Sequence, residues 1–158
     1  RKVIPSPVPV KVVEKDIINT LVKSGVIVIS VGGGGIPVIE KGNKLIGVEA
    51  VIDKDIASEC LAEELDADYL FVLTAVDKVA INFNKANQRN IDKMSVKEAE
   101  AWAEEGQFPA GSMLPKIQSA IKFVRSKPGR KAIISSLEKT REAILGQNGT
   151  IIYEDICG

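Results

Sequence analysis

Short apolar runs alternate along this chain with segments in which apolar residues recur every three or four positions. The apolar runs predict strands that are buried on both faces, at residues 26–31, 69–73 and 131–135. The periodic segments predict amphipathic helices, at residues 13–22, 53–65, 95–105, 117–124 and 135–145. Strands that alternate with helices indicate an α/β fold, with a mostly parallel sheet and helices on both faces.

Glycine-rich and polar stretches separate these elements. Residues 32–35 are four glycines that form a turn, and residues 36–46 predict a hairpin. Residues 79–83 predict a further short strand, and residues 84–93 are polar and predict a surface excursion. The helix 95–105 follows, and its start carries a capping box, Ser95-Val-Lys-Glu98. The loop 74–78 follows the strand 69–73, and ligands of open α/β sheets bind at such strand ends.

Two lysines are predicted in the first turns of helices. Lys54 follows Asp53, and Lys116 follows Pro115, a residue that favours the first helical turn. A lysine there slightly opposes the helix dipole, but free N–H groups at a helix start bind phosphate well. Two interpretations are therefore open: a polyphosphate site that both lysines serve, or two solvated lysines.

The four glycines do not complete a known nucleotide-binding motif. If Gly32 and Gly34 begin G-x-G-x-x-G, the third position is Pro37, and G-x-x-x-x-G-K-[ST] does not occur. Consecutive glycines at a strand end still allow the backbone to approach a ligand, with N–H groups directed at an anion. We favour this interpretation over a plain flexible turn, because glycine loses the most backbone entropy on folding.

Asp53 and Asp55 flank Lys54 but do not form a catalytic carboxylate pair, because residues two apart on a helix point in nearly opposite directions. Asp53 is predicted to cap the helix. Asp55 either orients a lysine such as Lys54 or is a solvated acid that the helix dipole stabilises.

Composition excludes several classes of function. Lys+Arg and Asp+Glu both number 21, so the chain has no basic excess for nucleic acid. The chain has no histidine and no C-x-x-C pair, which argues against zinc, thioredoxin-like and His-dependent nucleophilic chemistry, and we assign no residue as a metal ligand. No apolar run is long enough to span a membrane, and we expect a reducing, cytoplasmic setting.

The motifs, in their order, resemble the carbamate kinases of the amino-acid kinase family. The matching stretches are the Pro-Ser-Pro start and residues 32–38, 47–55, 73–79, 106–116 and 136–138. The start at Arg1, without an initiating methionine, agrees with this resemblance. We expect residues 1–158 to be one nucleotide-binding region, the C-terminal half of a protein about twice as long with a three-layer α/β sandwich fold.

The resemblance implies reversible phosphoryl transfer between ADP/ATP and carbamoyl phosphate/carbamate with Mg²⁺, in arginine metabolism, by a cytoplasmic homodimer. It implies that Lys54, Asp55 and Lys116 are catalytic, with Asp55 organising the lysines. The residues implied around the nucleotide are Lys54, Thr74, Ala75, Val76, Asp77, Val79, Met113 and Lys116. The residues implied to line the phosphoryl-transfer cleft are Gly32, Gly33, Gly34 and Gly35.

Two residues depart from the family pattern. The family leads us to expect aspartate at Ala75 and glycine at Leu114, whose side chain could crowd the nucleotide entrance. These departures would support one alternative, a nucleotide-binding domain without catalysis. The other alternative is a different amino-acid kinase that acts on a carboxylate. On the leading hypothesis, the acceptor half is missing and the 158-residue chain alone is inactive.

Overall fold

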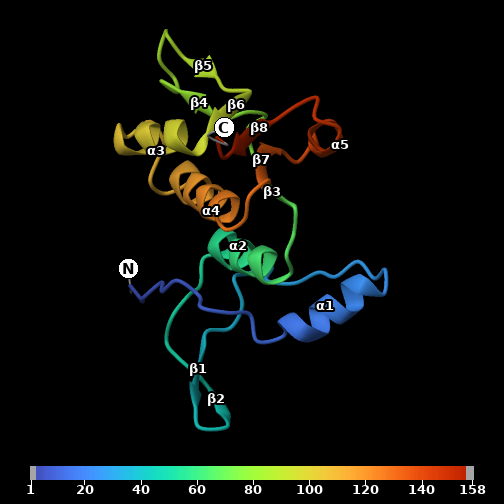
Figure 1. Cartoon of the computed structure of the whole chain (residues 1–158). Helices are drawn as coiled ribbons and strands as arrows, with labels where there is room; N and C mark the ends of the chain where they lie inside the picture. Colours follow the sequence, from blue (N-terminus) through green and yellow to red (C-terminus); the bar gives the residue numbers. More distant parts are fainter. Residues whose placement is uncertain (1–2, 156–158) are drawn as a thin grey trace. The chain divides into compact units, whose positions relative to one another are not determined.

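The computed structural model describes residues 3–155, so Cys157 lies outside the described residues. The chain divides into two units, Arg1–Asp66 and Ala67–Gly158, and each is described by itself (Figure 1). No helix within the described residues is both long and apolar enough to cross a bilayer.

A four-stranded sheet forms the centre of the second unit. Its order is β3 (Tyr69–Thr74), β7 (Lys131–Ser136), β8 (Thr150–Tyr153) and β6 (Lys93–Ser95). β3 pairs with β7 and β6 pairs with β8 in parallel, whereas β7 and β8 are antiparallel. The α/β class is confirmed, but the sheet is mixed.

The antiparallel return of β8 follows from the short connection after β7. The predicted helix 135–145 is reduced to α5 (Thr140–Ile144), because Ser135 and Ser136 still belong to β7. Gly149 then adopts φ +94°, and a Cβ there would lie 3.1 Å from the carbonyl oxygen of Ile134. Glycine thus lets the chain turn back closely against the strand that it has just left.

Helices cover the sheet on both sides. α3 (Val96–Glu104) and α4 (Met113–Arg125) pack on each other and α4 contacts the sheet, while α5 contacts β7 from the other side (Figure 1). The apolar face predicted for α4 is buried and consists of Ile117, Ala120, Ile121 and Val124. Trp102 of α3 is half-buried.

β3 is buried on one face only, so the prediction of a strand buried on both faces is wrong here. Leu70 and Val72 are buried, whereas Tyr69, Phe71 and Leu73 are exposed. The reason is position, because β3 is the edge strand of the sheet and one of its faces lacks a covering layer among the described residues.

The polar segment 84–93 is also more ordered than predicted. It contains β5 (Arg89–Asn90), which pairs with β4 (Ala80–Ile81), and the buried side chain of Ile91. It also holds Lys93, the first residue of β6. Two- and three-residue strands are too short to show a period in the sequence.

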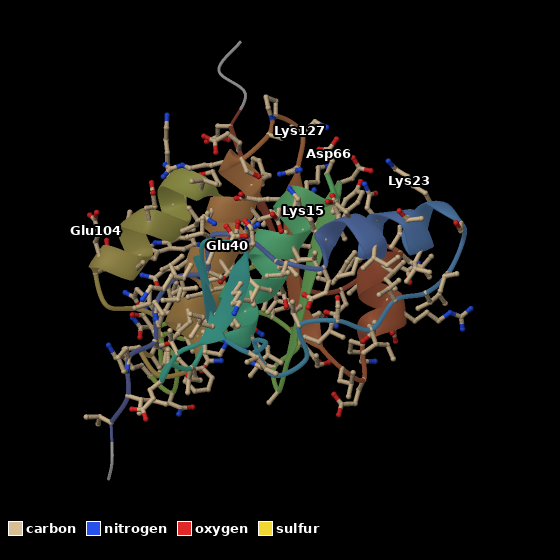
Figure 2. All side chains as sticks on the ribbon, turned by 90° about the horizontal axis from the view of Figure 1, so that it is seen from below. Lys15, Lys23, Glu40, Asp66, Glu104 and Lys127 are labelled. Atoms are coloured by element: carbon tan, nitrogen blue, oxygen red, sulfur yellow. The ribbon has the colours of Figure 1, made fainter. Side chains whose placement is uncertain are left out.

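The first unit contains two helices and a hairpin. α1 (Lys15–Lys23) ends before Gly25, and Lys15 and Lys23 lie at its opposite ends (Figure 2). The predicted hairpin is β1 (Val38–Lys41) and β2 (Lys44–Gly47). α2 (Lys54–Glu64) is tied to the entry of α1, because the Val12 N–H donates to the Glu64 carboxylate at 2.9 Å.

Residues 26–31 do not form the buried strand that their sequence predicts. They belong to no strand, and the side chains of Ile27 and Ile29 are 94% and 96% exposed. A strand can be buried on both faces only inside a sheet, and no described residue pairs with this segment.

The capping box of α3 provides a first test. Ser95 Oγ accepts from the Glu98 N–H at 3.3 Å, and the Ser95 N–H donates to Glu98 at 2.8 Å. Ser95→Ala should lower the free energy of unfolding by about 1 kcal/mol in urea denaturation. Ser112→Ala is the matched control, because Ser112 occupies the N-cap position of α4 but its side chain makes no capping hydrogen bond. Equal losses in both variants would contradict the assignment.

Candidate functional site

The glycine turn of the first unit lies directly against the chain that enters α2. Gly34 has φ +95°, and a Cβ at this position would lie 1.9 Å from the carbonyl oxygen of Ile52. No side chain fits there, so glycine is required at position 34. Gly32, Gly33 and Gly35 differ, because a Cβ on each would meet nothing within 4 Å.

Asp53 sets the start of α2, as its sequence position predicts. Its carboxylate accepts from the backbone N–H groups of Asp55 at 2.8 Å and Ile56 at 3.3 Å. These N–H groups are therefore engaged within the protein. These two N–H groups are not free to bind a phosphate. The positive charge of Lys54 is the attraction for phosphate that remains at this helix start.

Lys54 and Asp55 form an ion pair at this helix start. The Lys54 ammonium lies 3.4 Å from both carboxylate oxygens of Asp55. The Lys54 side chain is 57% exposed and the Asp55 side chain 13% exposed. Asp55 is therefore not the fully solvated acid of the alternative interpretation. A largely buried carboxylate holds a cation that solvent, and hence a ligand, can reach.

The loop after β3 in the second unit leaves the sheet beside the end of β7. Thr74 and Ser136, the last residues of these parallel strands, are paired in register. The Ser136 hydroxyl donates a hydrogen bond to the Asp77 carboxylate, and accepts one from the Lys139 N–H at 3.3 Å. Asp77 is thereby fixed at the strand ends, while neighbouring Ala75 is exposed.

The far end of this loop is anchored in the core. Val79 is fully buried, and its N–H donates to Thr150 Oγ1 at 2.8 Å. The Thr150 hydroxyl donates in turn to the Ile91 carbonyl at 2.6 Å, and the Ile91 N–H donates to the Val79 carbonyl at 2.8 Å. The loop of Thr74, Ala75, Val76, Asp77 and Val79 therefore has both ends held.

Lys116 is the fourth residue of α4, within its first turn as predicted. The helix begins earlier than Pro115, at Met113, and both Met113 and Lys116 are half-buried. The N–H groups of residues 112–114 all approach the Pro109 carbonyl, at 3.1–3.2 Å. Pro115 has no N–H, so Lys116 offers an anion its charge rather than a set of free backbone donors.

The expected site residues form two groups, one in each unit. The glycine turn, Lys54 and Asp55 lie in the first unit, and the loop 74–79, Met113 and Lys116 lie in the second. Within the first unit, the turn and the start of α2 are in direct contact. That both lysines serve one phosphate chain stays a prediction.

Sequence reasoning missed two residues that hold the loop 74–79 in place. Ser136 belongs to the matched stretch 136–138, but its partner Asp77 is 59 positions away. Thr150 gives no local signal, because its contact with Val79 spans 71 positions. Only the pairing of distant strands brings these groups together.

Comparison with known proteins identifies the family. The sequence model of the amino acid kinase family matches residues 2–136, and this chain belongs to that family. It is 55% identical over 154 residues to the carbamate kinase-like protein YqeA of Escherichia coli (strain K12), covering 98% of this chain and 50% of that protein. It is 54% identical over 154 residues to the carbamate kinase of Clostridium perfringens, covering 98% of this chain and 49% of that protein.

A solved relative shares the fold at similar coverage. The carbamate kinase from Giardia lamblia bound to AMP-PNP superposes with a TM-score of 0.93 at 42% identity, over 98% of this chain and 49% of that one. The chain thus spans about half the length of the relatives it matches. The α/β fold is that of the carbamate kinases.

The contact between Gly34 and Ile52 gives the second test. Gly34→Ala should lower the free energy of unfolding by about 2 kcal/mol or more, because left-handed backbone and a backbone clash both oppose a Cβ. Gly33→Ala, where a Cβ meets nothing, should change it by less than about 0.5 kcal/mol. Chemical denaturation of both variants measures the difference, and similar values would refute the packing.

Proposed function

We propose that this chain supplies the nucleotide-binding half of a carbamate kinase. The reaction moves a phosphoryl group from carbamoyl phosphate to ADP, or back from ATP to carbamate. The observation that carries the proposal is the Lys54–Asp55 ion pair, set on a capped helix start beside a glycine turn, in a chain 54% identical to a carbamate kinase.

The proposed chemistry needs positioning and charge rather than a nucleophilic side chain. In phosphoryl transfer, the bond from phosphorus to one oxygen breaks as the bond to the other forms, and negative charge spreads over the transferring group. Lys54 would stabilise that charge with its exposed ammonium. Asp55 would limit where the ammonium can go, because its carboxylate lies 3.4 Å away.

The second unit would bind the nucleotide. The loop 74–79 would lie against the nucleoside, with Asp77 held by Ser136 and Val79 held by Thr150. Lys116 would contact the phosphates from the first turn of α4, with Met113 near the nucleoside. This chain has alanine at position 75, where the family is expected to have aspartate. Position 75 is exposed, so the missing carboxylate leaves no buried polar group without a partner.

The described residues do not offer a ready-made magnesium cage. They contain no cluster of three or more histidine, cysteine or acidic side chains that could hold a metal ion. Magnesium in phosphoryl transfer is bound largely through substrate phosphates and water, with one or two carboxylates. We therefore place Mg²⁺ with the nucleotide and assign it no step on these residues. The homodimeric, cytoplasmic state of the complete enzyme belongs to the same proposal.

The isolated chain should bind nucleotide without completing the reaction. We expect calorimetry to detect ADP binding to the 158-residue protein in the presence of Mg²⁺. A luciferase assay should find no ATP formed from ADP and carbamoyl phosphate, because the chain covers 49% of a carbamate kinase. Robust ATP formation would show that these residues contain a complete acceptor site.

The two lysines should matter for nucleotide affinity and not for stability. Lys54→Ala and Lys116→Ala should each weaken ADP binding at least tenfold, because charge-assisted hydrogen bonds contribute about 1.5–3 kcal/mol and 1.4 kcal/mol is one decade. Lys97→Ala is the matched control, since Lys97 is an exposed lysine in the first turn of α3. Normal affinity in both site variants would support two solvated lysines and a non-catalytic role.

A further inference from the structure

The second unit contains a cavity at the end of its sheet that lies away from the loop 74–79. The cavity has a volume of about 490 Å³ and is lined by Val124, Arg125, Pro128, Gly129 and Glu154. These residues come from the last turn of α4, the turn that leads into β7, and the position after β8. The loop 74–79 is held by Ser136 at the other end of β7, a strand that spans roughly 17 Å. The cavity is therefore separate from the candidate nucleotide site.

Glu154 gives this cavity an unpaired acceptor. The residue is half-buried, and its Oε2 oxygen is buried and receives no hydrogen bond from any described residue. A carboxylate oxygen that has lost water without gaining a donor raises the free energy of the folded chain. A ligand that brings an N–H group to this oxygen would remove that cost.

The basic side chains of the same stretch are engaged elsewhere or exposed. Both terminal nitrogens of Arg125 donate to the carboxylate of Glu100, one of them at 2.7 Å. Arg130 is buried, and its guanidinium carbon lies 4.9 Å from the centre of the Phe123 ring. Lys127 is exposed, where solvent and salt screen its charge. The unpaired carboxylate oxygen therefore selects the charge of a ligand in the cavity.

The rest of the lining favours an organic cation. Val124 and Arg125 belong to the last turn of α4, and a helix C-terminus carries partial negative charge. Val124 and Pro128 give the cavity an apolar wall that suits methylene groups. A bare metal ion is less suitable, because residues 3–155 contain no group of three or more acidic, cysteine or histidine side chains that could hold one.

We propose that this cavity binds a primary alkylammonium ion. The ammonium donates a hydrogen bond to Glu154 Oε2, and the methylene chain lies against Val124 and Pro128. Such a charge-assisted bond satisfies the oxygen that the fold leaves without a donor. The volume of about 490 Å³ also lies within the range of small-molecule sites.

An NMR titration of the isotope-labelled 158-residue chain with n-butylammonium chloride tests the assignment. The amide signals of Val124, Gly129 and Glu154 should shift together and reach saturation. n-Butyltrimethylammonium has the same charge but no N–H donor, so it should bind at least tenfold more weakly. Butyrate should shift none of these signals. Equal binding of both cations, a response to butyrate, or no saturable shift with n-butylammonium would each overturn the proposal.

Matched substitutions locate the contact at one carboxylate. Glu154→Gln keeps the shape of the side chain and removes its charge, so it should weaken n-butylammonium binding at least tenfold. Asp155→Asn is the control, because it removes one charge from the exposed neighbouring residue and should leave the affinity within about twofold. Equal losses in the two variants would show only a general attraction to acidic side chains, and unchanged binding in Glu154→Gln would equally refute the site.

The comparison of the three probes uses the unaltered chain, so it decides the question even if a variant fails to fold. ADP is absent from every titration. The result is therefore independent of the proposed function, and either conclusion can fail while the other stands.

Discussion

The contact of Gly34 with the Ile52 carbonyl is the constraint on which the first unit's candidate site depends. It presses a turn with left-handed backbone against the residues that lead into α2, where no side chain can intervene. The Asp53 cap then fixes the first turn of that helix. The Gly34 contact and the Asp53 cap together give Lys54 and Asp55 a defined position at the start of α2.

In the second unit, contacts between residues far apart in the sequence hold the loop 74–79 in place. Parallel pairing of β3 with β7 ends both strands together, and one hydroxyl–carboxylate bond holds the loop at Asp77. Buried Thr150 both accepts and donates, so it satisfies the Val79 N–H and the Ile91 carbonyl at once. A loop anchored in this way loses little entropy when it binds a ligand, which favours affinity.

Burial is distributed unevenly between the two units. Most buried apolar side chains belong to the second unit, and most of the exposed large ones among the described residues belong to the first. Hydrophobic burial is the main favourable term in folding, so a unit that exposes its isoleucines and valines gains little stability of its own. The strand-like sequence at 26–31 belongs to this exposed set, since it pairs with no strand among the described residues.

The sequence alone determined the features that depend on neighbours close in the chain: the helices α1, α2, α3 and α4, the caps at Asp53 and Ser95, and the hairpin of β1 and β2. It also indicated the family, through motifs that the comparison then matched. Only the tertiary structure decided the antiparallel direction of β8, the half-exposed face of β3, the unpaired state of residues 26–31, and the partners of Asp77 and Val79. The physical reason is range. Capping and helical periodicity act between residues close in sequence, whereas strand order and burial depend on which distant segments are present to pair.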